Sequence, residues 1–363
     1  MNETTTTATN REGNVDEIKY LLALNKKHSD LFISPKVSGE RRLYRSKYPL
    51  EIIAYKCMDG RLNLSLMTET APGIIQPMRN VGAKFVFGWP VVRDVITEHY
   101  EYALKKKRAC LVVASYHFSR GDTHRGCAGF NGDTDAARAF ASGVKKDHID
   151  VFGNGESFYA ILVGIETDLD ALILHGDNEN DIVDLSTITD SSVENVKGIL
   201  RSLYPNMPSE MICNFLPLIL GNIRHIDAVR KANRPVEDIV HKEWVLAFGR
   251  GFDWFHEPNT AIIVGPFDEE LRNPITTAAR LLLSNLKEGR VSHKNVVLVS
   301  SAPYRNRSGY DHLAARKKAI WQNDFAMRVI TQNSDLKDLL PHLRQLTAVM
   351  DMETRALEII SST

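Results

Sequence analysis

Three residues with complementary chemistry, Cys57, Asp59 and Arg61, occupy alternate positions directly after the apolar run 51–55. The run predicts a strand. In an extended segment, alternate side chains point to the same side of the backbone. A thiol, a carboxylate and a guanidinium can therefore share one side, which predicts a soft metal ligand beside an Asp–Arg ion pair.

Two further candidate ligands follow the apolar, β-branched run 109–116, which predicts a buried strand that ends at His117. Cys127 comes ten residues after this histidine, and Asp133 is the expected N-cap of the next helix. A helix N-terminus near Cys127 would favour its thiolate form. Together with Cys57, these residues would give zinc three protein ligands and leave the fourth position open to water, as in catalytic sites.

Two histidines compete for the third ligand position. His117 lies at a predicted strand end, where the backbone holds a ligand rigidly, whereas His124 lies in a loop with glycine and aspartate. We favour His117 for this reason and retain His124 as the alternative ligand. His124 and His99 are also the candidates for a proton shuttle.

These motifs resemble those of the β-class carbonic anhydrases, and most closely the carboxysome-shell branch of that class. The resemblance covers residues 45 to 335 approximately. Its motifs are Cys57-x-Asp59-x-Arg61, Arg79-Asn80-Val81-Gly82, the strand ending in His117, the segment from His124 to Ala128, and Gly164 to Ala171 with a short strand to His175. The interval from His117 to Cys127 is one residue shorter than that branch leads us to expect, so both histidines stay in competition.

The resemblance implies a carbonate dehydratase, a lyase that hydrates carbon dioxide reversibly to bicarbonate and a proton. Zn²⁺ would be held by Cys57, His117 and Cys127, and zinc-bound hydroxide would attack carbon dioxide. Asp59 would orient the hydroxide, and Arg61 would hold Asp59 by a bidentate contact. Release of Asp59 would let its carboxylate displace the water, so an open and a closed resting state both remain.

The second half of the chain repeats the order of strands and helices of the first. The repeated elements are strands at 244–248 and 295–301 and a helix at 278–286. Gly249 and Arg250 take the place of Cys57, Pro303 stands near the place of His117, and no cysteine follows position 213. We therefore predict a pseudo-dimer with a degenerate second copy that cannot build the same metal site. The alternative is a second α/β domain of unrelated ancestry.

Strands that alternate with helical patterns predict an α/β fold, here a β-carbonic-anhydrase-like sheet flanked by helices and internally duplicated. The expected regions are a disordered polar tail at 1–14, a catalytic zinc-binding domain with an N-terminal helix at 15–181, a helical connection at 182–240 and the degenerate copy at 241–363. We expect the N-terminal helix, at 15–27, to pack on the catalytic domain or on a neighbouring chain.

Composition argues against several other classes of protein. The 45 basic and 45 acidic residues cancel, which argues against a broad surface for nucleic acid or anionic membrane. No stretch approaches the roughly 20 apolar residues of a membrane span. Four cysteines do not form a disulfide framework in a chain of this length, and we expect Cys110 and Cys213 to be buried. The C-x-x-C redox motif and the Pro-Cys-x-x-Cys deaminase motif are both absent from the sequence.

The expected partners are carbon dioxide, bicarbonate and further copies of the chain, with the carboxysome shell or Rubisco added by the resemblance. About fifty residues precede Cys57, so residence in a carboxysome, and a part in carbon dioxide fixation, rest on the resemblance alone; the cytoplasm is the alternative. Two rival functions are hydrolysis of carbonyl sulfide or carbon disulfide on the same scaffold, and a zinc-bound scaffold without turnover. Asp59 and Arg61 argue against the scaffold, because structural zinc needs no carboxylate to orient hydroxide.

Overall fold

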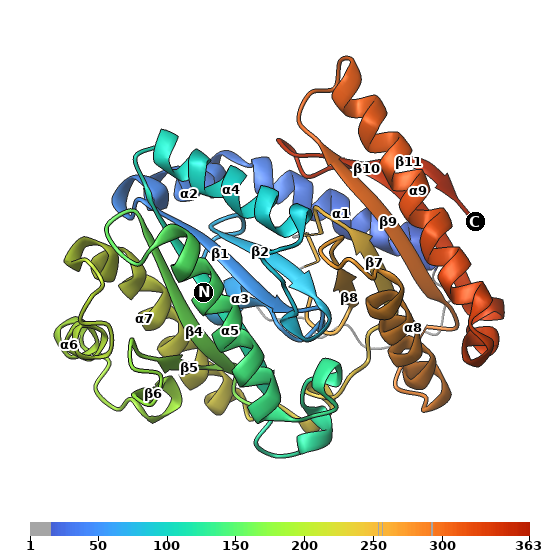
Figure 1. Cartoon of the computed structure of the whole chain (residues 1–363). Helices are drawn as coiled ribbons and strands as arrows, with labels where there is room; N and C mark the ends of the chain where they lie inside the picture. Colours follow the sequence, from blue (N-terminus) through green and yellow to red (C-terminus); the bar gives the residue numbers. More distant parts are fainter. Residues whose placement is uncertain (1–15, 253, 256, 292) are drawn as a thin grey trace, which may run out of the picture.

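The computed structural model describes residues 16–252, 254–255, 257–291 and 293–363, and the expected tail at 1–14 lies outside these ranges. Within them the chain forms two mixed β-sheets flanked by helices, which confirms the predicted α/β class. Figure 1 shows the two sheets beside each other.

The first sheet has the strand order β2-β1-β3-β4-β5-β6. Its strands are β1 (Leu50–Cys57), β2 (Ile75–Asn80), β3 (Ala109–Phe118), β4 (Phe158–Glu166), β5 (Ala171–His175) and β6 (Ile182–Asp184). The first four run parallel, and β5 and β6 are antiparallel to their neighbours. Every position of β1 and β4 is buried. Burial on both faces explains why these strands are continuous apolar runs in the sequence.

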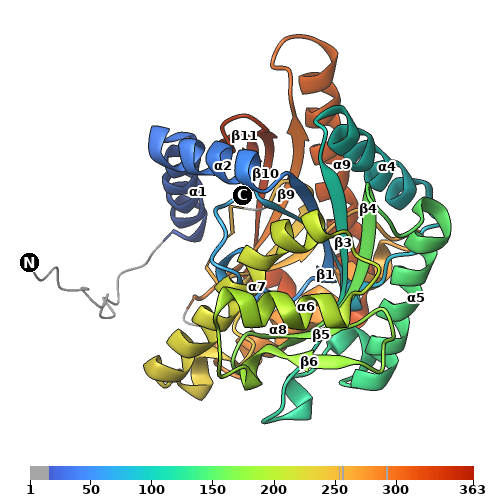
Figure 2. The same ribbon diagram turned by 90° about the vertical axis from the view of Figure 1, so that its left-hand side faces the viewer.

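Helices cover both faces of the first sheet. They are α3 (Leu64–Met67), α4 (Pro90–Lys105), α5 (Thr134–Phe152), α6 (Val193–Leu203) and α7 (Ser209–Ala232), with short 3₁₀ turns η1 (Val81–Ala83), η2 (Thr123–Arg125), η3 (Ala128–Phe130) and η4 (Leu185–Thr187). Figure 2 shows α5 and α7 on opposite sides of β3 and β4. Asp133 is the N-cap of α5, as predicted, because its side chain accepts a hydrogen bond from the Ala136 backbone N–H at 2.9 Å.

The second sheet repeats the strand order of the first. Its order is β11-β10-β9-β7-β8. The elements are β7 (Val245–Gly249), β8 (Ala261–Val264), β9 (Val296–Tyr304), β10 (Leu343–Asp351), β11 (Leu357–Ser362), α8 (Arg272–Lys287), α9 (Tyr310–Gln332), η5 (Val236–Asp238) and η6 (Ser334–His342). Thus β8-β7-β9-β10-β11 corresponds to β2-β1-β3-β4-β5, and the final strand is antiparallel in both series. The helices α4 and α8, which precede β3 and β9, are both 16 residues long.

The two sheets meet where β8 approaches the end of β2 and the turn after β1 (Figure 1). Backbone N–H groups of the second half donate to carbonyls of the first: Ile263 to Met58 at 3.0 Å, Gly265 to Arg79 at 2.9 Å and Asn259 to Gly60 at 3.0 Å. The residues after β1 are thereby fixed by main-chain bonds to the other half of the molecule.

The N-terminal helix α1 (Glu17–Ile33) lies beside β11 (Figure 2), whereas α2 (Pro35–Lys47) reaches the loop before β2, where Arg45 donates to the Gly73 carbonyl at 2.7 Å. Buried polar side chains of α1 bind the turn between β10 and β11: Asn25 donates to the Arg355 carbonyl at 2.9 Å and Ser29 to the Thr354 carbonyl at 2.8 Å. Through these residues the expected helix packs on the second half of the molecule. Among the described residues, none of the helices combines the length and the apolar character needed to cross a bilayer.

Candidate metal centre

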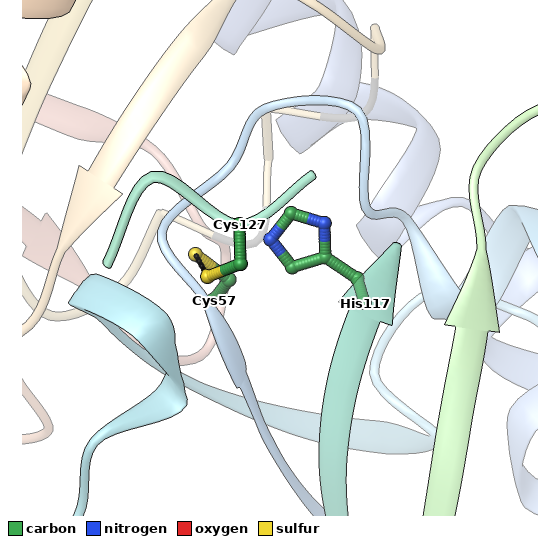
Figure 3. A group of neighbouring side chains, drawn as sticks. All are labelled: Cys57, His117 and Cys127. Atoms are coloured by element: carbon green, nitrogen blue, oxygen red, sulfur yellow. Dashed lines mark hydrogen bonds between the residues drawn. The ribbon is translucent and has the colours of Figure 1, made fainter. Parts of the chain in front are cut away.

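Cys57, His117 and Cys127 meet at the carboxyl edge of the first sheet, where its parallel strands end (Figure 3). Cys57 is the last residue of β1, His117 is next to last in β3, and Cys127 directly precedes η3. The three side chains are buried, and one donor atom from each lies within 4.8 Å of the others. The two sulfur atoms are 3.8 Å apart. Two sulfurs at about 2.3 Å from one tetrahedral zinc would have about this separation.

The surroundings of the His117 ring indicate that this residue is a metal ligand. Its side chain is 2 % exposed, and neither ring nitrogen has a hydrogen-bond partner among the described residues. Buried polar atoms are nearly always paired, and two thiols beside an imidazole are donors that zinc prefers. The residues therefore fit Zn²⁺. His124, the alternative ligand, is exposed on η2 and lies outside the group.

The two thiols differ in acidity. The hydrogen bond from Cys127 and the nearby imidazole of His117 hold the pKa of Cys57 well below its usual range, although burial opposes this. The pKa of Cys127 is raised by the same contact with Cys57 and by burial, and the Gly129 backbone N–H only partly offsets this. The expected effect of a helix terminus on Cys127 is thus outweighed by Cys57. A bound metal would release the proton that Cys127 retains.

Asp59 and Arg61 form a buried, two-pronged ion pair beside the group. Arg61 donates from Nη2 to Oδ2 at 2.6 Å and from Nε to Oδ1 at 3.0 Å. Its backbone N–H also donates to Oδ1 at 2.8 Å, because the chain turns after Cys57. The expectation that 57–61 is extended is therefore wrong: a turn, and not strand alternation, brings the pair together.

The surroundings keep the Asp59 carboxylate ionised and fixed. Burial opposes ionisation, but the charge of Arg61 and the rings of His241 and His117 hold the pKa of Asp59 well below its usual range. The guanidinium of Arg61 donates in addition to the carbonyls of Ile239 at 2.9 Å and Arg125 at 2.8 Å. Two main-chain carbonyls thus hold the guanidinium while it binds both oxygens of Asp59.

His241 and Glu243 complete the site, and the sequence analysis missed both. Nε2 of His241 lies 3.8 Å from Oδ2 of Asp59, and Nδ1 lies 3.1 Å from Glu243. Burial disfavours the charged ring, but Glu243 and Asp59 raise the pKa of His241; the charge of His241 in turn lowers the pKa of the fully buried Glu243. Glu243 also accepts the Gly60 backbone N–H at 3.1 Å. Their alternate spacing just before a predicted strand was the only signal in the sequence.

The Arg79–Gly82 motif supports the Cys127 loop. Asn80 lies opposite Cys57 in the sheet register and caps η1. Gly82 has φ +61°, and its backbone touches Gly129, where an added Cβ would lie 2.7 Å from the Gly82 nitrogen. Two glycines are needed at this contact, and they bring Cys127 close to the end of β2.

Three other residues from the sequence analysis lie outside this centre. His99, a candidate proton shuttle, is on α4 and lines a different cavity at the second sheet. Cys110 is buried, as expected, whereas Cys213 is only partly buried.

Part of the chain matches a described protein family. A sequence model of the carboxysome shell carbonic anhydrase catalytic domain matches residues 89–197, which include His117 and Cys127 but not Cys57. The carboxysome shell carbonic anhydrase of Prochlorococcus marinus subsp. pastoris is 29% identical over 236 residues, which cover 56% of this chain and 46% of that protein. The protein of the same name from P. marinus strain MIT 9313 is 27% identical over 233 residues (56% and 45%), and that from Hydrogenovibrio crunogenus 24% over 264 residues (62% and 50%). The chain spans about half the length of these curated relatives.

Proposed function

Because the chain is a distant member of the carboxysome shell carbonic anhydrase family, we propose that it catalyses the reversible hydration of carbon dioxide to bicarbonate and a proton. The observation that carries this proposal is the buried group of Cys57, His117 and Cys127, whose imidazole has no hydrogen-bond partner among the described residues. The pair of Asp59 and Arg61 supports turnover, because a purely structural zinc site needs no carboxylate held beside the ligands.

We assign Cys57, His117 and Cys127 as the zinc ligands. Zinc, when bound, lowers the pKa of a coordinated water so that hydroxide is available near neutral pH. Asp59 accepts a hydrogen bond at this side of the site, and its ionised state suits it only as an acceptor. Arg61 occupies both oxygens of Asp59 and so prevents the carboxylate from becoming a ligand. This arrangement supports an open resting state.

The segment just before β7 contributes directly to this mechanism. The Ile239 carbonyl holds Arg61, and Glu243 holds the backbone of Gly60 between the two members of the pair. His241 faces Asp59 with one ring nitrogen and Glu243 with the other. We assign it the role of a positioning residue that is also placed to take up a proton near the site.

The finer description of the fold that we propose is an internal duplication with a degenerate second copy. The shared strand order and the antiparallel last strand support common ancestry over an unrelated α/β domain. The proposed regions are 15–181, 182–240 and 241–363. In this arrangement the second copy supplies residues to the catalytic site as the partner subunit of a dimer would.

We further propose the carboxysome as the location of the protein, with the shell or Rubisco as macromolecular partners, because its relatives carry the carboxysome shell in their names. Association of further copies of the chain belongs to the same proposal. Fluorescence microscopy of a tagged chain in its host tests the location, and light scattering of the purified chain tests the assembly.

The direct test is stopped-flow hydration of carbon dioxide by protein of measured zinc content. The comparison is wild type, Cys57→Ala and Asp59→Ala, with Cys110→Ala as the control for a buried thiol outside the centre. Zinc near one per chain, with hydration lost in the first two variants and kept in the control, is the expected result. Bound zinc without hydration under reducing conditions, between about pH 7 and 9, would overturn the assignment; assays with carbonyl sulfide and carbon disulfide would then separate a hydrolase from a scaffold.

A further inference from the structure

A cavity lies at the carboxyl edge of the second sheet, in the place that corresponds to the metal centre of the first. Its volume is about 110 Å³. Gly249, Arg250 and Pro303, which the sequence analysis aligned with Cys57 and His117, all line it. The end of β2 and one side of α4 close it from the first half of the molecule. The second copy has therefore lost the metal ligands but retained an open space.

The polar lining of this cavity is basic. The described lining residues that carry charge or an imidazole are Arg79, His99, Arg250, Arg305 and Arg355, and none of the described lining residues is a carboxylate. Arg305 reaches outward to Glu98 at 3.0 Å. Arg79 donates weakly to the Asp59 carbonyl, at 3.5 Å, and Arg355 lies over the Phe32 ring.

Arg250 is a cation of the cavity for which the described ranges hold no ion-pair partner. Its side chain is partly buried and forms no ion pair with any residue that the structure describes. Burial and the charge of Arg305 lower the pKa of Arg250, and Glu98 only partly offsets them. The pKa of Lys318 is lowered by burial and by Arg250. Positive charge is thus concentrated around the cavity, and a bound anion would relieve it.

We propose that this cavity binds a small oxyanion, of the bicarbonate or phosphate kind, with Arg250 as its principal ligand. A guanidinium presents its N–H donors as a planar fork that matches two oxygens of such an ion. His99 is kept neutral by burial and by Arg250, which lower its pKa, so it can share a hydrogen bond with the ion. A volume of about 110 Å³ exceeds the roughly 30 Å³ occupied by one water several-fold, which leaves room for an ion of this size.

Gly251, two residues after β7, lines the cavity at a place where a larger residue does not fit. Gly251 has φ +89°, and a Cβ there would lie 2.4 Å from the Met350 side chain. The rings of Phe252 and Phe267 form apolar walls, so the charge is presented in a partly desolvated place, where a charge-assisted hydrogen bond is stronger than in water. The site needs no metal, and the proposal does not depend on carbon dioxide hydration.

The test is isothermal titration calorimetry of the zinc-loaded protein. Sodium phosphate and sodium bicarbonate are titrated separately, and sodium chloride keeps the ionic strength constant. Arg250→Gln removes the charge, and Arg250→Lys keeps the charge but removes the fork. The matched control is Arg280→Gln, because Arg280 lies on α8 outside the lining and pairs with Asp335 on the surface. Thermal unfolding of each variant without added anion shows whether it is folded.

We expect at least one anion to bind the wild type and the Arg280→Gln control equally. Arg250→Gln should weaken this binding by about tenfold or more, and Arg250→Lys by less, as expected for charge-assisted hydrogen bonds. The anion that loses affinity in Arg250→Gln is the ligand; bicarbonate held at the metal centre would be unaffected by this variant. Absence of binding by both anions, or equal binding by wild type and Arg250→Gln, would overturn the proposal without touching the proposed enzymatic function.

Discussion

The carboxyl edges of the two sheets differ sharply in charge, although the sheets share one strand order. In the first sheet, β1 and β3 bring Cys57 and His117 into a group of donors that fits a soft cation. In the second, β7 ends at Gly249, and β9 carries Pro303 beside a basic cavity. The shared strand order places the two edges alike, and the residue types at two strand ends give the edges different charge.

The carboxyl edge of the first sheet also depends on residues that come from outside that sheet. Ile239, His241 and Glu243 come from the segment before β7, and they hold Arg61, face Asp59 and bind the intervening backbone. At the second edge, residues of β2 and α4 from the first half likewise line the cavity. Each edge is thus completed by the opposite half, as in a symmetric dimer.

The largest expected effect is that of removing the His117 imidazole, which belongs to the first edge and not to the second. We expect His117→Ala to abolish stoichiometric zinc binding and carbon dioxide hydration, because two thiols alone leave the metal with too few protein ligands. His124→Ala is the control and should retain both, since that side chain is exposed. Zinc content by mass spectrometry and stopped-flow hydration check this. Loss of zinc in His124→Ala, with zinc retained in His117→Ala, would reverse the choice of ligand.

A smaller loss should follow from Asp59→Asn, which removes the charge without the volume. Arg61 would lose its buried counter-ion. We expect kcat/KM to fall by about 100-fold with zinc content unchanged, as for residues that orient the groups at a metal site without binding the metal. Asp227→Asn, at an exposed pair on α7, should keep full activity. Unchanged kcat/KM in Asp59→Asn would remove this carboxylate from the mechanism.

Glu243→Gln measures how strongly the second half holds the site. It breaks a buried charge pair with His241, and we expect the free energy of unfolding to fall by about 3 kcal/mol near pH 6. Because the pKa of His241 is raised in the folded state, its contribution to the free energy of unfolding is complete below about pH 6.5. This contribution is lost as pH rises through the folded-state pKa. Because the pKa of Glu243 is lowered, its own contribution to the free energy of unfolding is lost only in solutions more acidic than about pH 6.

The difference between wild type and Glu243→Gln should therefore shrink from about pH 6 to pH 9. Urea unfolding of zinc-loaded protein at the two values measures it. Glu69→Gln, at an exposed pair with Arg224, should change stability by less than about 1 kcal/mol at either pH. A difference that grows toward pH 9 would contradict a charged His241 in the folded state.

The smallest effect concerns the helices that follow β3 and β9. Asp133 caps α5 with its side chain, whereas α9 begins after Gly309 without a side-chain cap. We expect Asp133→Ala to lower the free energy of unfolding by about 1 kcal/mol and to leave zinc content unchanged. Asp150→Ala, at an exposed pair of the same helix, should have a smaller effect. Loss of zinc in Asp133→Ala would show that this cap also positions the Cys127 loop.

The elements of the fold and the types of metal donor were predictable because they depend on local pattern. Buried parallel strands produce the apolar runs that end at Cys57 and His117. The contacts of His241 and the packing of α1 on the second sheet depend on how distant segments meet, which periodicity does not encode. Residue type predicts the pairing of Asp59 with Arg61 correctly, but not its geometry, because the chain turns after Cys57 where the pattern predicts an extended segment.

The meeting of β2 and β8 within one chain has a further consequence. Two parts joined by a linker face each other at an effective concentration in the millimolar range, which dilution of the protein does not alter. The main-chain bonds from Asn259 to Gly60 and from Ile263 to Met58 belong to this contact. The metal centre will therefore keep the residues that support it at the lowest concentrations used in an assay, where a site shared between separate subunits would come apart.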